Sequence, residues 1–199
     1  GRVARIDTNG ETVNFNTGLT GDGALQKFGN GTLKLNTTSS YSGGTIVNGG
    51  TLALGVNNAL NSAGAVNVNT GGVLDLGGTT QRISSLALAG GSVTGGVLTA
   101  TSYVLESGLL ASEISGNGSL IKNGNGVAMI TSMNDLFTGQ TIINGGTLQL
   151  GNGGNKPATL GSADITKSGR IMNNGMLAFK FAPGTEVVIS NWLMGTGSI

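Results

Sequence analysis

The chain has 199 residues, of which 38 are glycine, 2 are proline and none is cysteine or histidine, and its formal net charge is +1. Glycine without a three-residue period excludes collagen, and 38% apolar against 10% charged residues excludes a disordered linker. The near-neutral charge gives no electrostatic case for nucleic acid or an anionic membrane as a partner. Without histidine and cysteine, the chain has no Ser-His-Asp site, no Cys-His site and none of the usual zinc sites.

The first twenty residues contain one short alternating run. Val13 and Phe15 alternate with Thr12 and Asn14, which predicts a strand. Charged residues flank this run, and mixed charge of this kind indicates an exposed surface. The flanking residues are Arg2, Arg5, Asp7 and Glu11.

The motif Thr45–Gly55, TIVNGGTLALG, returns as TIINGGTLQLG at Thr141–Gly151. In each copy, two alternating runs flank an Asn-Gly-Gly whose residues accept the positive φ of a sharp turn. The motif therefore predicts a strand, a tight glycine corner and a second strand. The side chains expected to point inward from the second strand are Leu52, Leu54, Leu148 and Leu150.

Each motif closes a longer repeat, with one copy at Gly21–Gly55 and another at Gly116–Gly151. Gly195–Ile199 matches Gly116–Leu120, which predicts that a third copy begins at residue 195. Long-period self-similarity is typical of a solenoid. We therefore predict that residues 1–199 form a single segment cut from a longer array.

Two architectures could use these strands: β-hairpins at each Asn-Gly, or rungs stacked in parallel. Frequent glycine corners, short runs and a long repeat favour an all-β fold, a right-handed single-stranded parallel β-helix (a β-solenoid). At roughly 20–25 residues a rung, the chain makes about eight to ten rungs. Leu105–Ile114 is the one candidate for a helix, and Gly108 weakens it.

Most aromatic side chains are expected in the core of this β-helix. These are Phe15, Phe28, Phe137, Phe179 and Phe181. Three others could lie at corners, although core packing is favoured for them too: Tyr41, Tyr103 and Trp192. Both ends of such a stack would expose open strand edges.

A few charged residues are candidates for chemistry. The acidic ones that could act as paired carboxylates are Asp75, Glu106, Glu113 and Asp135. No two of them have a defined spacing, so solvated outward positions are favoured. Gly21-Asp22-Gly23 hints at a calcium loop, but the second copy has Asn117 in place of Asp22, which favours a glycine corner with an Asx turn.

Lys27 and Lys122 occupy equivalent positions in the two copies. We interpret them as outward strand lysines that discourage pairing at sheet edges. With no Ser-His-Asp or Cys-His site, no usual zinc site and no phosphate loop in the pattern, we predict no catalytic, metal or cofactor site. The residues of a binding site stay unknown from the sequence.

The two copies resemble the passenger-associated transport repeat of Gram-negative autotransporters (type V secretion). That family's pattern runs G-x-G-x-L-x-K-x-G-x-G-T-L-x-L and then Y/F-x-G-x-T-x-I-x-x-G-T-L-x-L-G. The first copy follows it nearly throughout, whereas the second has Val127–Ile130 in place of T-L-x-L. The resemblance implies a β-helical passenger that is exported to the bacterial surface or released. It also implies a C-terminal outer-membrane β-barrel outside this fragment and no membrane insertion of this segment.

The resemblance leaves several functions open. We expect an interaction module that meets host cells, either an adhesin or a virulence effector that binds a host cell-surface protein or glycan receptor. The alternatives are a passive stalk or autotransport scaffold, and a self-associating module. A β-helical polysaccharide lyase or hydrolase is the least favoured, and it would need Asp75 within reach of another carboxylate or of Arg82. We expect that the chain is not an enzyme.

Overall fold

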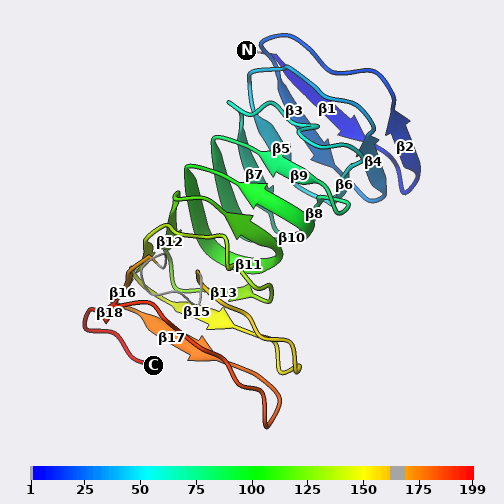
Figure 1. Cartoon of the computed structure of the whole chain (residues 1–199). Helices are drawn as coiled ribbons and strands as arrows, with labels where there is room; N and C mark the ends of the chain where they lie inside the picture. Colours follow the sequence, from blue (N-terminus) through cyan, green and yellow to red (C-terminus); the bar gives the residue numbers. More distant parts are fainter. Residues whose placement is uncertain (1, 162–168) are drawn as a thin grey trace.

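The computed structural model describes residues 2–161 and 169–199. The strands stack along one axis, with the two termini at opposite ends of the stack (Figure 1). Every pairing between strands is parallel, and the stack makes about nine turns of a β-solenoid. The predicted parallel β-helix is thus confirmed and the hairpin alternative is wrong.

Each rung of the solenoid has up to three sides. Side 1 contains β1 (Val3–Asp7), β3 (Ala24–Phe28), β5 (Thr45–Val47), β7 (Ala65–Asn69), β12 (Ser119–Lys122), β14 (Thr141–Ile143), β16 (Ile171–Asn173) and β18 (Leu193–Met194). Side 2 contains β2 (Thr12–Phe15), β4 (Thr32–Leu35), β6 (Gly50–Leu54), β8 (Gly72–Asp75), β13 (Val127–Ile130), β15 (Thr147–Leu150) and β17 (Met176–Phe179). Side 3 has the short strand β9 (Thr80–Arg82).

The two longest strands, β10 (Ser85–Thr99) and β11 (Ser102–Ser115), run through all three sides of their rungs. β10 pairs with β7 on side 1, with β8 on side 2 and with β9 on side 3. The proposed helix at Leu105–Ile114 is wrong, because these residues belong to β11. The described residues contain no helix long and apolar enough to cross a membrane.

The core is a set of aliphatic columns that run along the axis, one residue from each rung. Leu52 and Leu54 are buried, as predicted, and so are their counterparts Leu148 and Leu150. Gly50 and Gly146 have φ of 61° and 60°, which confirms the predicted turn at each Asn-Gly-Gly. Because side chains alternate between the two faces of a strand, the apolar set of each rung lies directly on that of the next.

The aromatic residues divide between core and surface. Phe137, Tyr41 and Tyr103 are buried, and the rings of Tyr103 and Phe137 meet edge to face with centroids 6.0 Å apart. Three core predictions are wrong, since Phe179 is 42% exposed, Trp192 is 63% exposed and Phe28 lies on the outward face of β3. Phe179 lies on the core face of β17, in one of the last rungs, where fewer neighbours cover it. Trp192 is in register with Arg170 on the outward face, just before β18. Phe28 lies outward and the Arg5 guanidinium stacks over its ring at 5.2 Å, whereas Phe15 and Phe181 pack partly against the core.

The N-terminal rung begins one strand earlier than the alternation predicted. β1 pairs with β3 in register from Val3 to Asp7, although only Ile6 in this segment packs against the core. The flanking charges lie on the surface as predicted: Arg2, Arg5, Asp7 and Glu11 are exposed. At the other end, Ser198 forms a bridge with Met176 of β17 on side 2, whereas Gly195 lies against Asn173 at the end of β16.

Candidate functional site

The corner that follows β3 is closed from inside by a lysine. The Lys27 side chain is fully buried, and its Nζ donates hydrogen bonds to the carbonyl oxygens of Phe28 (2.8 Å) and Gly29 (3.0 Å). It also reaches the carbonyl of Gly49 in the next rung at 3.3 Å. An ammonium has three donors and no acceptor, so it matches a corner in which several carbonyls turn inward. Lys27 therefore ties two adjacent rungs together at their corners.

The second copy repeats this corner. Lys122 is fully buried, and its Nζ donates to the carbonyls of Asn123 (2.6 Å), Gly124 (3.1 Å) and Gly145 (3.2 Å). Gly145 belongs to the next rung, as Gly49 does in the first copy. The prediction that both lysines point outward is wrong, because each lies in register with buried aliphatic residues of its column.

Burial lowers the pKa of both lysines, because removing water disfavours the charged ammonium. A nearby carboxylate opposes this shift in each case: Asp7 raises the pKa of Lys27, and Glu106 raises that of Lys122. Each ammonium is held by backbone carbonyls and is inaccessible to solvent. The lysine corners are therefore suited to holding the backbone, and they offer no surface to a ligand.

The acidic candidates lie apart on different sides of the solenoid. Asp75 ends β8 on side 2, where its register neighbours are Ala53 and Thr94, and its Oδ1 accepts the Gly77 amide at 2.9 Å. Arg82 lies on side 3 and pairs with Thr99.

The other carboxylates are also separated. Glu113 lies beside Val97 on side 3, Asp135 accepts a hydrogen bond from the Thr159 hydroxyl at 3.1 Å, and Glu106 is exposed. Asp22 is exposed at its corner. Among residues 2–161 and 169–199 there is no group of three His, Cys, Asp or Glu that could hold a metal ion.

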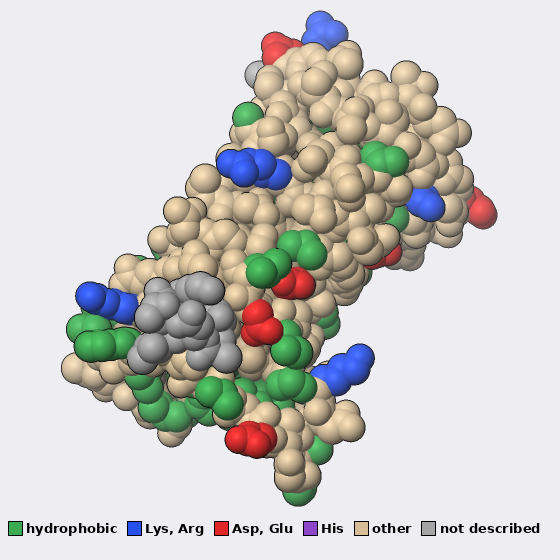
Figure 2. Space-filling model, viewed as in Figure 1, with side chains coloured by type: hydrophobic (Ala, Val, Ile, Leu, Met, Phe, Trp, Pro, Cys, Tyr) green, Lys and Arg blue, Asp and Glu red, His purple; other side chains and the backbone are tan. Residues whose placement is uncertain are grey.

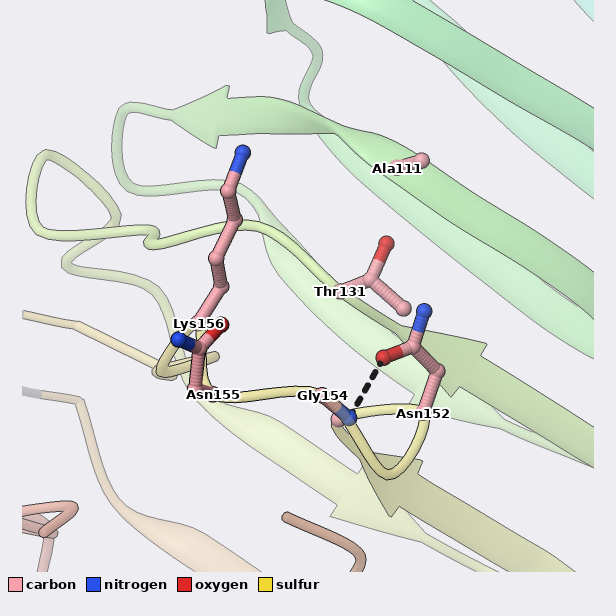
Figure 3. A pocket seen from close by; sticks show the side chains of 7 residues that line it. Ala111, Thr131, Asn152, Gly154, Asn155 and Lys156 are labelled. Atoms are coloured by element: carbon pink, nitrogen blue, oxygen red, sulfur yellow. Dashed lines mark hydrogen bonds between the residues drawn. The ribbon is translucent and has the colours of Figure 1, made fainter. Parts of the chain in front are cut away.

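A cleft of about 420 Å³ opens on side 2, beside the loop that follows β15 (Figure 3). Ala111, Thr131 and Asn152 lie in a row along three successive rungs, and the Asn155 and Lys156 side chains project from the loop. The loop is shaped by an Asx turn in which Asn152 Oδ1 accepts the Gly154 amide at 3.1 Å.

Most side chains that line this cleft carry hydroxyl, amide or ammonium groups, so it can donate and accept hydrogen bonds. Its volume is in the range of small-molecule sites. Sequence reasoning did not single out these residues, because a polar glycine-rich loop looks the same whether or not a cleft lies beside it. The cleft is the candidate surface for binding a polar ligand.

Comparison with known proteins agrees with the repeat pattern. The passenger-associated transport repeat matches residues 25–54 and 120–150. The chain is 36% identical over 178 residues to the adhesin BmaC autotransporter of Brucella suis, a match that covers 84% of this chain and 5% of that protein. It is 27% identical over 194 residues to the uncharacterized lipoprotein YdeK of Escherichia coli, covering 92% of this chain and 13% of that protein. No solved structure matches the chain significantly.

The chain therefore spans only a small part of the length of each of these relatives. The two matched segments coincide with the copies found by self-comparison, and each contains one lysine corner. The repeats, the parallel solenoid and the similarity to an autotransporter adhesin together show that this chain belongs to the autotransporter passenger domains with passenger-associated transport repeats.

Proposed function

We propose that this chain is part of a passenger exported to the cell surface, where it acts in adhesion to host cells through a surface protein or glycan receptor. The observation that carries the proposal is the similarity to a named autotransporter adhesin, which extends over 84% of the chain. An adhesin-like role is thus supported for the passenger, and host-receptor binding is our extension of it.

The solenoid offers a suitable surface for such contact. Parallel rungs place side chains from successive turns in straight ladders, and stacked repeats commonly bind partners over extended faces. Amide ladders join neighbouring rungs at the corners: Asn69 Nδ2 donates to Asn48 Oδ1 at 2.6 Å, and Asn144 Nδ2 donates to Asn123 Oδ1 at 2.9 Å. The cleft beside Asn152 and Lys156 adds a polar recess to side 2.

The test is a binding assay of the purified chain on cultured host cells, with phosphorylation of host receptors read alongside. We expect saturable binding, and signalling in addition would indicate an effector. A double variant, Asn152→Ala with Lys156→Gln, tests the cleft, and Asn125→Ala with Lys34→Gln is the matched control away from it, because both control side chains are exposed. A folded, β-rich sample that binds no host cell would contradict the proposal and indicate that this segment serves as a stalk.

A further inference from the structure

Two clefts lie end to end on side 3, and Arg82 of β9 lies between them. Ser40 and Asn58 are among the residues that line the first cleft, which has a volume of about 380 Å³. Thr99 and Asn117 are among those that line the second, of about 160 Å³. Arg82 lines both clefts, which together cross five successive rungs. We call the two clefts the side-3 groove.

The Arg82 side chain is an unpaired charge in this groove. Among the described residues that line the groove, only Arg82 is charged. It is exposed, and its guanidinium forms no hydrogen bond or ion pair with any residue in the ranges 2–161 and 169–199. Glu113 on side 3 is two rungs and two residues away by strand register, roughly 12 Å between Cα atoms. Figure 2 shows that charged side chains are few and scattered on the face in view. The positive charge of Arg82 is therefore available to a ligand.

The preceding rung fixes the backbone of Arg82 and places an amide beside it. Asn58 Oδ1 accepts the backbone amide of Arg82 at 3.1 Å, as the carbonyl of a neighbouring strand would. Asn57 does the same for the amide of Thr80 at 2.9 Å. Asn58 has a φ of 50°, a left-handed conformation that asparagine tolerates better than most residues. Its Nδ2 has no partner among the described residues, so an unused amide donor lies beside Arg82.

Hydroxyl and amide groups line much of the remaining groove. Thr38, Ser40 and Ser62 are exposed, and their hydroxyls form no hydrogen bond with a described residue. At the other end of the groove, Asn117 is also exposed, and its side-chain amide has no partner in the described part of the chain. The groove thus presents one cation, with neutral groups on both sides that donate and accept hydrogen bonds.

We propose that the side-3 groove binds an oligosaccharide that carries one carboxylate among neutral sugars. A planar guanidinium binds a carboxylate through two parallel hydrogen bonds, which is the strongest polar contact that this groove offers. Sugar hydroxyls donate and accept hydrogen bonds, so they match serine, threonine and asparagine side chains. Five rungs span four intervals of ~4.8 Å, roughly 19 Å, which is long enough for several linked sugars.

Other classes of ligand fit the groove less well. A nucleic acid or a highly sulfated glycan is charged along its whole length and binds through several lysines or arginines, whereas the described lining has one. An extended peptide adds to a free sheet edge, but β9 is already paired on both sides, by the side chains of Asn57 and Asn58 and by β10. An isolated carboxylate in a neutral, hydroxyl-rich chain complements this surface.

The inference rests on the proposed function in one respect, namely that the ligand is a glycan on a cell surface. It adds the chemical class of that glycan and a site on side 3, apart from the cleft beside Asn152. A chain that binds host cells but no carboxylated sugar would overturn this inference alone. A chain that binds the sugar but no host cell would overturn only the adhesion proposal.

The experiment is a titration of the whole isotope-labelled chain with sialyllactose up to about 10 mM, followed by NMR. Lactose is the matched ligand, because it is the same sugar without the carboxylated residue. We expect a dissociation constant near about 1 mM for sialyllactose and one at least about tenfold higher for lactose. The shifted backbone amides should centre on Asn58, Arg82 and Asn117.

Two variants test the residues that carry the proposal. Arg82→Gln should raise the dissociation constant for sialyllactose at least about tenfold, because the carboxylate loses its charged partner. Asn58→Asp keeps the Oδ1 that accepts the Arg82 amide, but it places a competing carboxylate beside the guanidinium and should also block binding. Arg2→Gln is the matched control, since it removes the same charge from an exposed position outside the groove. Circular dichroism checks that each variant keeps its β-structure.

Four results would overturn the proposal. Sialyllactose could shift no amide up to the highest concentration, lactose could bind as tightly as sialyllactose, or Arg2→Gln could weaken binding as much as Arg82→Gln. The fourth is a set of shifts confined to the cleft beside Asn152, which would place the sugar on side 2. Loss of binding in Arg82→Gln and Asn58→Asp, with retention in Arg2→Gln, would support the side-3 groove.

Discussion

The two repeat copies and the rungs between them make the same solenoid with different corners. Where the chain turns into side 1, the second copy has Gly118 and Gly139, and the middle rungs have Ser84 and Thr101 in the same column. A methyl group on Gly139 would overlap the carbonyl oxygen of Gly118. The repeats thus bring successive rungs so close at this corner that no side chain fits, whereas the middle rungs leave room for one.

The corner between side 1 and side 2 shows a second difference. In the repeats the strand ends at this corner, and Lys27 or Lys122 donates hydrogen bonds to the backbone carbonyls that turn inward. In the middle rungs the same column holds Leu88 and Leu105, and β10 and β11 continue through the corner as strands. Register shifts after Leu88 let the ladder bend.

The comparison shows that a parallel solenoid can turn a corner in two ways. It can bend a continuous strand through a bulge, so the backbone groups stay in the ladder and the buried side chain is apolar. It can also end the strand sharply, and then a buried donor must satisfy the freed carbonyls. The repeat motif places glycine where the chain turns into side 1, because no side chain fits there, and lysine where it turns into side 2, because the freed carbonyls need an internal ammonium.

The largest expected effect comes from filling the close corner. Gly139→Ala should lower the free energy of unfolding by about 3 kcal/mol, because the added methyl meets backbone atoms that cannot move aside. Ser84→Ala in the same column of the middle rungs should change it by less than about 0.5 kcal/mol. Urea unfolding followed by circular dichroism measures both. A small effect of Gly139→Ala would show that the rungs can separate at this corner.

The next effect tests the lysine corners directly. Lys122→Leu makes the repeat resemble the middle rungs in this column, but the corner keeps its inward carbonyls without a donor. We expect a loss of about 2 kcal/mol in the free energy of unfolding, the cost of leaving buried acceptors unpaired. Lys34→Leu is the control, because Lys34 points outward from β4 and is exposed. Equal stability of Lys122→Leu and the wild type would contradict the assigned role of the ammonium.

The sequence was sufficient to predict the solenoid, because alternation, glycine corners and the long repeat all indicate parallel rungs. It also contained the signal for the lysine corners, since Leu25 and Lys27 are two residues apart and so lie on the same face of β3. Charged side chains generally lie on the surface, and this tendency led to the wrong prediction that Lys27 and Lys122 point outward. Alternation was the stronger constraint because a strand with one buried face cannot turn a single residue outward.

The surface features could not be predicted in the same way. The cleft beside Asn152 forms because the loop after β15 passes beside two other rungs. The local sequence does not specify how far the loop lies from those rungs. Trp192 was predicted wrongly because its register with Arg170, which puts it on the outward face, cannot be read from its local sequence.

A smaller effect separates the two buried tyrosines. In the middle rungs, the Tyr103 hydroxyl accepts the Ala100 amide at 2.7 Å and donates to the Leu98 carbonyl at 2.9 Å. In the first repeat, Tyr41 shares a single hydrogen bond of 2.6 Å with the Thr45 hydroxyl. Tyr103→Phe should cost about 1.5 kcal/mol and Tyr41→Phe about 0.7 kcal/mol, because only the first change leaves a backbone amide unpaired. Equal losses in urea unfolding would contradict this ranking.

The smallest expected effect is the pH dependence of the lysine corners. Burial lowers the pKa of Lys27 and Lys122 in the folded chain, so the unfolded chain binds more protons once pH approaches the folded-state pKa. The free energy of unfolding should therefore rise from neutral pH toward about pH 10. Above that range it should fall, because burial raises the pKa of Tyr41 and Tyr103 to about 12 and the tyrosines of the unfolded chain lose their protons first.

The two limbs of this profile can be assigned separately. A double variant, Lys27→Leu with Lys122→Leu, should remove the rise and keep the alkaline fall, whereas Tyr41→Phe with Tyr103→Phe should do the reverse. Urea unfolding between pH 7 and about pH 11 covers both limbs, because the unfolded-state pKa values of lysine and tyrosine lie within it. A rise that persists in the double lysine variant would mean that other groups titrate, and the repeat corners would then differ from the middle rungs in shape but not in charge.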